Sequence, residues 1–124
     1  MFSRKKILIV DDEEGIREVL SASLEHRDYD ILTAVDGQDG LEQAQQNIPD
    51  LILLDVVMPK LDGWQVMQIL QQDEKTRDIP IVIVSAKSET ESIFRSKEHR
   101  AVDHFIKPVN LHELRAFVHR YVGR

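Results

Sequence analysis

The chain has 124 residues, of which 42% are hydrophobic and 31% charged, and this composition favours one globular domain with a single core. The formal net charge of −6 argues against nucleic acid as a direct partner, because phosphate backbones attract basic surfaces. The absence of cysteine excludes disulfides and thiolate chemistry, and no apolar run has the length of a secretory signal or a membrane span, so we expect a cytoplasmic protein.

The first half of the chain predicts two strand–helix units. The apolar run Ile7–Val10 predicts a buried strand, and the acidic residues 11–14 suit the start of the following helix. The apolar stripe expected on that helix consists of Ile16, Val19, Leu20 and Leu24. Tyr29–Ala34 predicts a short strand at an edge of the sheet. We expect Gly37 and Gly40 to break the chain before a helix that carries Leu41, Ala44 and Ile48 and ends at Pro49-Asp50.

The middle of the chain repeats this alternation. The run Leu51–Leu54 is too short for a buried helix, and its residues do not alternate between apolar and polar. It therefore predicts a strand that is buried on both faces and ends in Asp55. Residues 61–63 predict a turn before a helix that starts near Trp64 and carries Val66, Ile69 and Leu70. Ile81–Val84 predicts another buried strand, which ends in Ser85.

The last third predicts two further helices around a short strand. Residues 86–100 predict a helix with Ile93 and Phe94 as its main apolar pair, and Asp103–Ile106 predicts the final strand, followed by Lys107-Pro108. Asn110 suits an N-cap, with Glu113 three residues later as in a capping box. The last helix has the clearest stripe, formed by Leu111, Leu114, Val118, Tyr121 and Val122.

This order alternates strand and helix five times, which predicts a parallel sheet with helices on both faces. The ends of parallel strands meet at one edge, where ligands of open α/β sheets bind. We therefore expect Asp11, Asp12, Asp55, Ser85 and Lys107 to converge at this carboxyl edge of the sheet. Nearby carboxylates repel each other and favour a cation, and a ligand set of oxygens alone selects Mg²⁺ or Mn²⁺. With a lysine and a hydroxyl, such a set suits phosphoryl transfer, and a carboxylate such as Asp55 can itself be the nucleophile.

Each of these residues also has a purely structural interpretation. Asp11 and Asp12 could cap a helix, Asp55 could begin a turn, Ser85 could cap the next helix, and Lys107 could be a solvated lysine. These interpretations do not explain why a polar group follows every central apolar run, so we favour a functional site.

The chain resembles the receiver domains of bacterial two-component response regulators over essentially its whole length. The matching features are Val10-Asp11-Asp12, Leu53-Leu54-Asp55 with Met58-Pro59 and Asp62-Gly63, Ser85-Ala86, and Lys107-Pro108. The resemblance implies a doubly wound, flavodoxin-like α/β fold with strand order 2-1-3-4-5. Asp11-Asp12-Glu13-Glu14-Gly15-Ile16-Arg17 and Asp103–Pro108 look most like the single-domain sporulation phosphorelay regulator, and the first segment also resembles nitrogen-regulatory receivers.

The resemblance also implies a role for each residue at the carboxyl edge. Asp55 would accept a phosphoryl group from a histidine of a sensor kinase or phosphotransfer protein. Asp12, Asp55 and the Val57 carbonyl would ligate Mg²⁺, with Mn²⁺ able to substitute, and Asp11 would act largely through water. Lys107 would contact the phosphoryl group, and the Ser85 hydroxyl would turn toward it on activation.

Four further positions follow from the resemblance. The aromatic residue that usually partners Ser85 aligns with His104, which could make the switch sensitive to pH or could be a partly exposed surface histidine. Ile16 lies on the kinase-docking surface of the sporulation relative and could equally belong to the core. The Lys107–Pro108 bond is often cis in relatives, and Arg100 stands where relatives often have glycine.

The leading hypothesis is that residues 1–124 form a receiver domain that works as a phosphorylation switch and turns over no metabolite. We expect no output domain within these residues. The switch would act through a downstream protein, or through an output domain if the chain is a fragment. An aspartyl-phosphate phosphatase would need a second aspartate at Val57 and space for a substrate cap. A flavin-binding protein would need a phosphate-cradling loop after the first strand. A phosphorylation-independent interaction module on the same fold stays open as the alternative, although Asp55, Ser85 and Lys107 are all present.

Overall fold

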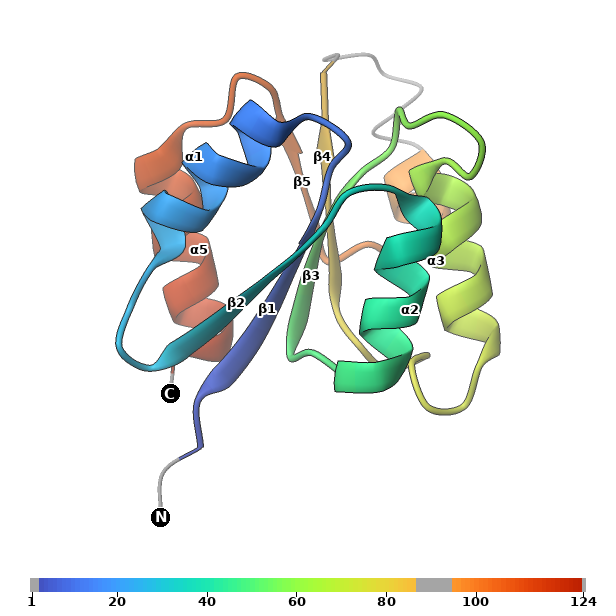
Figure 1. The fold of residues 1–124 in the computed structure, drawn as a ribbon, viewed down its shortest axis with the longest axis horizontal. Coiled ribbons are helices and arrows are strands. Elements are labelled where there is room, and N and C mark those ends of the chain that lie inside the picture. The colour runs from blue at the N-terminus through green and yellow to red at the C-terminus, as the bar shows by residue number, and fades with distance from the viewer. Residues whose placement is uncertain (1–2, 87–94, 124) are drawn as a thin grey trace.

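The computed structural model describes residues 3–86 and 95–123. Its centre is a five-stranded, all-parallel sheet in the order β2-β1-β3-β4-β5 (Figure 1). The strands are β1 (Lys5–Val10), β2 (Tyr29–Ala34), β3 (Leu51–Asp55), β4 (Ile81–Ser85) and β5 (Asp103–Ile106). The helices with described bounds are α1 (Glu14–Leu24), α2 (Gly37–Asn47), α3 (Gly63–Gln72) and α5 (Leu111–Val122). The predicted fold class, strand order and edge position of residues 29–34 are confirmed.

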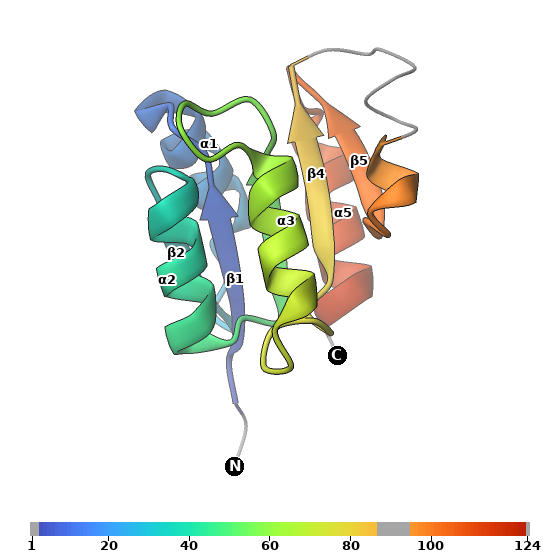
Figure 2. The same ribbon diagram turned by 90° about the vertical axis from the view of Figure 1, so that its right-hand side faces the viewer.

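Helices cover both faces of the sheet, with α1 and α5 on one face and α2 and α3 on the other (Figures 1 and 2). Successive side chains of a strand point to opposite faces, so β1 sends Ile7 and Ile9 toward α1 and α5, and Leu8 and Val10 toward α2 and α3. Both faces are therefore apolar, which explains why the central strands are continuous apolar runs.

Side-chain caps fix where several helices begin. Asp62 and Gln65 form the full capping box of α3, with both hydrogen bonds at 2.9 Å. The predicted N-cap Asn110 accepts a hydrogen bond from the Glu113 amide at 3.0 Å. The break expected at Gly37 and Gly40 before the helix is wrong, because Asp36 caps α2 and both glycines lie inside the helix. Gly40 permits close packing there, since a Cβ atom would lie 2.9 Å from Val10 Cγ1.

Some residues of the predicted apolar stripes do not reach the core. Val19 is 50% exposed and Tyr121 46%, so the stripes of α1 and α5 are narrower than their sequences predict. Residues 87–94 lie outside the described residues. Of the helix predicted over 86–100, the structure describes residues 86 and 95–100, of which only 95–98 are helical, because the chain turns at 99–100. In the part of the chain that is described, every helix is too short or too polar to cross a membrane.

We predict that Ile48→Gly stabilises the protein. Ile48 ends α2 with φ of 44°, in the left-handed region that β-branched residues avoid, and its side chain is 43% exposed. Glycine removes the steric penalty and little packing, so the free energy of unfolding in urea should rise by about 1 kcal/mol. The matched change Ile69→Gly, within α3 and 39% exposed, should lower it by about as much, because glycine weakens a right-handed helix. A loss of stability in Ile48→Gly would contradict the prediction.

Candidate functional site

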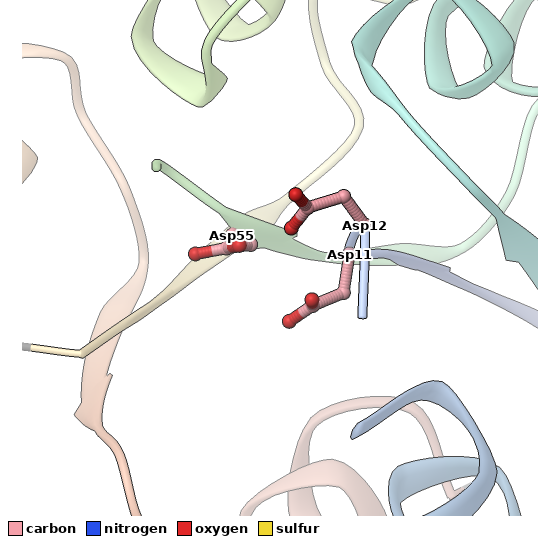
Figure 3. A group of neighbouring side chains, drawn as sticks. All are labelled: Asp11, Asp12 and Asp55. Atoms are coloured by element: carbon pink, nitrogen blue, oxygen red, sulfur yellow. The ribbon is translucent and has the colours of Figure 1, made fainter. Parts of the chain in front are cut away.

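The strand ends bring three carboxylates together at the carboxyl edge of the sheet. Asp11 and Asp12 follow β1, and Asp55 ends β3, its neighbour in the sheet. Each of the three offers a carboxylate oxygen within 4.8 Å of the other two (Figure 3). The register explains this arrangement, because Val10 pairs with Leu54, and the next residue of each strand is an aspartate. The convergence of these residues predicted from the sequence is confirmed.

Asp11 is buried, and both of its carboxylate oxygens accept hydrogen bonds. Oδ1 accepts from the Glu13 amide at 2.9 Å, and Oδ2 accepts from Lys107 Nζ at 2.8 Å. The backbone carbonyl of Asp11 accepts a further bond from Arg17 Nη1 at 2.7 Å. The capping interpretation is thus only partly right, because the N-cap of α1 is Glu13, and Asp11 is held from three directions.

Lys107 is the cation of the site. Its Nζ lies 2.8 Å from Asp11 Oδ2, 3.6 Å from Asp55 Oδ1 and 3.8 Å from Glu13 Oε1. Its side chain is 12% exposed, so the interpretation as a solvated surface lysine is wrong. Burial alone would lower the pKa of Lys107, but the Asp11 hydrogen bond and the surrounding carboxylate charges outweigh burial and raise it. Lys107 is therefore fixed in its charged form beside Asp55.

Asp55 is a buried carboxylate whose surroundings shift its pKa. Burial and then the negative charge of Asp11 raise the pKa of Asp55 to about 6, although Lys107 and a hydrogen bond from the Val57 amide at 3.3 Å act in the opposite direction. The Val57 side chain is 68% exposed. Asp55 is thus a carboxylate held in a setting where a negative charge is costly unless a cation is close.

Ser85 and His104 form a second polar group near this edge. Ser85 ends β4 and is buried, and its Oγ lies 3.0 Å from His104 Nε2. His104 Nδ1 lies 2.6 Å from the Oγ of Ser96 in the helical residues 95–98. Burial lowers the pKa of His104, and the nearby charge of Asp103 opposes this shift. His104 is half-buried and bonded at both ring nitrogens, so it is not merely a surface histidine.

The other predicted positions lie around this centre. Ile16 is half-buried and packs against the core between the sheet, α1 and α5. The Lys107–Pro108 peptide is cis, as predicted, and Pro108 is exposed. Arg100 has φ of 63°, in the left-handed region that favours glycine, the residue expected there from the family resemblance. Sequence reasoning missed the contacts of Arg17 and Ser96, because neither residue lies at a strand end, and the segment 11–17 gave no separate role to Arg17.

We predict that Asp55→Asn stabilises the metal-free protein at neutral pH. A raised pKa means that the folded state binds the Asp55 proton more tightly than the unfolded state, so the parent loses stability as pH rises from about 3.8 to about 6. Asparagine carries no charge to bury. The variant should gain about 1–3 kcal/mol at pH 7 in urea unfolding without divalent cations, and little at pH 3.5.

Asp78→Asn is the matched control for this measurement. Asp78 is exposed on the loop before β4, so its replacement should leave the free energy of unfolding unchanged at both pH values. Equal effects of the two substitutions, or a destabilised Asp55→Asn at pH 7, would contradict the electrostatic account of the site.

Known proteins share both the sequence and the fold of this chain. The response regulator receiver domain family matches residues 7–119. The chain is 42% identical over 120 residues to the alkaline phosphatase synthesis transcriptional regulatory protein PhoP of Bacillus subtilis, covering 97% of this chain and 49% of that protein. It is 39% identical over 119 residues to the DNA-binding dual master transcriptional regulator RpaA of Synechocystis, covering 96% and 49%. The chain thus spans about half the length of these curated relatives.

A solved structure gives the same result for the fold. The chemotaxis protein CheY4 of Vibrio cholerae superposes with a TM-score of 0.88 at 28% identity, and the match covers 97% of this chain and 100% of that chain. These relatives do not support the narrower resemblance to the sporulation phosphorelay regulator or to nitrogen-regulatory receivers. The sequence match over residues 7–119, together with the parallel sheet and its acidic edge, shows that the chain belongs to the response regulator receiver domain family of two-component signalling.

Proposed function

We propose that this domain accepts a phosphoryl group on Asp55 from a phosphohistidine of a sensor kinase or histidine phosphotransfer protein. The observation that carries the proposal is the pairing of a buried carboxylate with a fixed cation, since Lys107 Nζ lies 3.6 Å from Asp55 Oδ1. One Asp55 oxygen would attack phosphorus, the new O–P bond would form, and the P–N bond to the donor histidine would break. Lys107 would neutralise charge on the phosphoryl oxygens, and the Ser85 hydroxyl would donate a hydrogen bond to one of them.

The acidic cluster fits a hard divalent cation. Its three carboxylates supply oxygen ligands within 4.8 Å of one another, the donor type that Mg²⁺ prefers. We propose that Asp12 and Asp55 ligate Mg²⁺ directly, with the Val57 carbonyl, and that Mn²⁺ can substitute. Asp11 suits a water-mediated role, because both of its oxygens already accept hydrogen bonds. Bound Mg²⁺ would offset the negative charge of the carboxylates and of the incoming phosphoryl group.

Phosphorylation would then act as a signal through protein–protein contact. It adds charge where Asp11, Asp12 and Asp55 already repel one another, and so shifts an equilibrium between two conformations of the domain. We propose that a downstream protein, or an output domain, reads this shift in the cytoplasm. The transcriptional roles named for the relatives suggest that control of gene expression is one such output. We do not expect the acidic receiver domain itself to bind nucleic acid or a membrane.

Incubation with acetyl phosphate and Mg²⁺ tests the phosphoacceptor. We predict that the intact mass of the parent rises by one phosphoryl group, because a small phosphodonor needs no kinase surface. Asp55→Asn should show no adduct, whereas the exposed control Asp78→Asn should behave as the parent. An adduct that persists in Asp55→Asn would contradict the assignment. If no protein forms an adduct, beryllofluoride binding separates a short-lived phosphoryl group, which predicts binding, from a phosphorylation-independent module, which predicts none.

Mg²⁺ should also stabilise the folded domain through these carboxylates. Binding to the folded state alone adds about 1.4 kcal/mol at ten times the dissociation constant, so the melting temperature should rise with Mg²⁺ concentration. We predict that Asp12→Asn loses most of this rise, since Asp12 is exposed at the site and makes no hydrogen bond or ion pair within residues 3–86 and 95–123. The control Asp78→Asn should keep it. An equal rise in all three proteins would place the cation elsewhere.

A further inference from the structure

We propose that Arg17 is a positioning residue that raises the Mg²⁺ affinity of the domain by fixing the peptide unit between Asp11 and Asp12. Within residues 3–86 and 95–123, the Arg17 side chain bonds this backbone and pairs with no carboxylate. It supplies no oxygen ligand and acts only through the chain that carries Asp12. This inference rests on the proposed Mg²⁺ site and adds a residue to it that lies outside the acidic cluster.

One short hydrogen bond joins α1 to the end of β1. Arg17 Nη1 donates to the Asp11 carbonyl oxygen at 2.7 Å, and the donor is a charged guanidinium, which makes this a strong type of hydrogen bond. The carbonyl belongs to the planar peptide unit that links Asp11 to Asp12. A bond to this oxygen therefore restricts rotation of the whole unit. The orientation of that unit sets the direction in which the Asp12 side chain leaves the backbone.

Arg17 is held on a rigid support. It lies in the first turn of α1, where its amide donates to the Glu13 carbonyl at 3.1 Å. The residue before it, Ile16, packs against the core, and Leu20 of the next turn is buried. Side chains of a helix tilt toward its N-terminus, so the long Arg17 side chain reaches back to the end of β1. The helix thus fixes the loop that precedes it.

Asp12 depends on this support more than Asp11 does. The Asp11 carboxylate is buried and accepts hydrogen bonds from Lys107 and the Glu13 amide. Asp12 is exposed, and in the described part of the chain its carboxylate has no partner. The two side chains leave the backbone on opposite sides (Figure 3), so the bonds of Asp11 do not hold Asp12. Without Arg17, Mg²⁺ would have to order this peptide unit on binding, and that entropic cost would weaken its affinity.

The positioning role and the charge of Arg17 predict opposite effects on Mg²⁺. As a positive charge near the site, the guanidinium repels a cation, so its removal would tighten binding. As a support for the Asp12 backbone, it favours binding, so its removal would weaken it. A neutral substitution therefore separates the two by the sign of the change.

Nitrogen-15 NMR of the full chain measures this change, with Mg²⁺ titrated at constant ionic strength and the backbone amides as the readout. We expect the Mg²⁺ dissociation constant of Arg17→Met to rise about three- to tenfold, the range for loss of one hydrogen bond. Arg17→Lys keeps an N–H donor and should recover part of the affinity. Arg115→Met, at an exposed position on α5, is the matched control and should bind as the parent does.

The metal-free protein gives an independent readout. The heteronuclear NOE of the Asp12 amide should fall in Arg17→Met, because the peptide unit before it is released, and should stay unchanged in Arg115→Met. A residue that only stabilises the fold would lower the melting temperature without changing the Mg²⁺ affinity of the folded protein. A folded Arg17→Met that binds Mg²⁺ as tightly as the parent, or more tightly, would overturn the inference.

Failure of the inference differs from failure of the proposed function. A parent that binds no Mg²⁺, or that binds it as Asp12→Asn does, contradicts the proposed metal site, and the role of Arg17 falls with it. Normal Mg²⁺ binding by the parent, lost in Asp12→Asn but kept in Arg17→Met, overturns the role of Arg17 alone. If Arg17→Met does not fold, Arg17→Gln replaces it, since glutamine is too short to span the same distance. Its Mg²⁺ affinity should fall as much, and parent-like affinity would overturn the inference.

Discussion

The ion pair between Lys107 and Asp11 makes the rest of the site possible. The β1–β3 register sets Asp11 and Asp55 side by side at the end of two strands whose other residues are apolar. Two buried carboxylates repel each other and lose hydration, so this arrangement is unfavourable unless a cation is present. Lys107 supplies that cation at 2.8 Å from Asp11 and 3.6 Å from Asp55, and it comes from the opposite half of the sheet. The residual negative charge suits the divalent cation that we propose for this site.

The same geometry connects the chemistry with the surface of the domain. Three segments place a residue beside Asp55: Asp11 follows β1, Lys107 follows β5, and Val57 lies in the loop after β3. A change in the charge of Asp55 therefore changes the electrostatic force on Asp11 and Lys107, which lie at the ends of strands on either side of β3. Near the same edge, Ser85 and Ser96 both lie within hydrogen-bond distance of the His104 ring.

Local sequence determines much of this architecture. Continuous apolar runs identified the central strands, and a polar residue after each run identified the carboxyl edge, because parallel strands can only bring their ends together there. Tertiary contacts determine what sequence patterns missed. Gly40 of α2 lies so close to Val10 that a side chain would not fit, and Val19 of α1 is half exposed although it belongs to the predicted apolar stripe. Ser96 contacts His104 because the fold brings residues 95–98 beside β5, which the local sequence does not indicate.

The central claim is that Asp55 carries the phosphoryl group as an acyl phosphate. Borohydride reduces an acyl phosphate to an alcohol, so reduction of phosphorylated protein followed by peptide mass spectrometry identifies the residue. The account predicts homoserine at position 55 and at no other position, in protein treated with acetyl phosphate and Mg²⁺. A phosphoryl group that resists reduction, or an alcohol formed at another carboxylate such as Asp12, would contradict it.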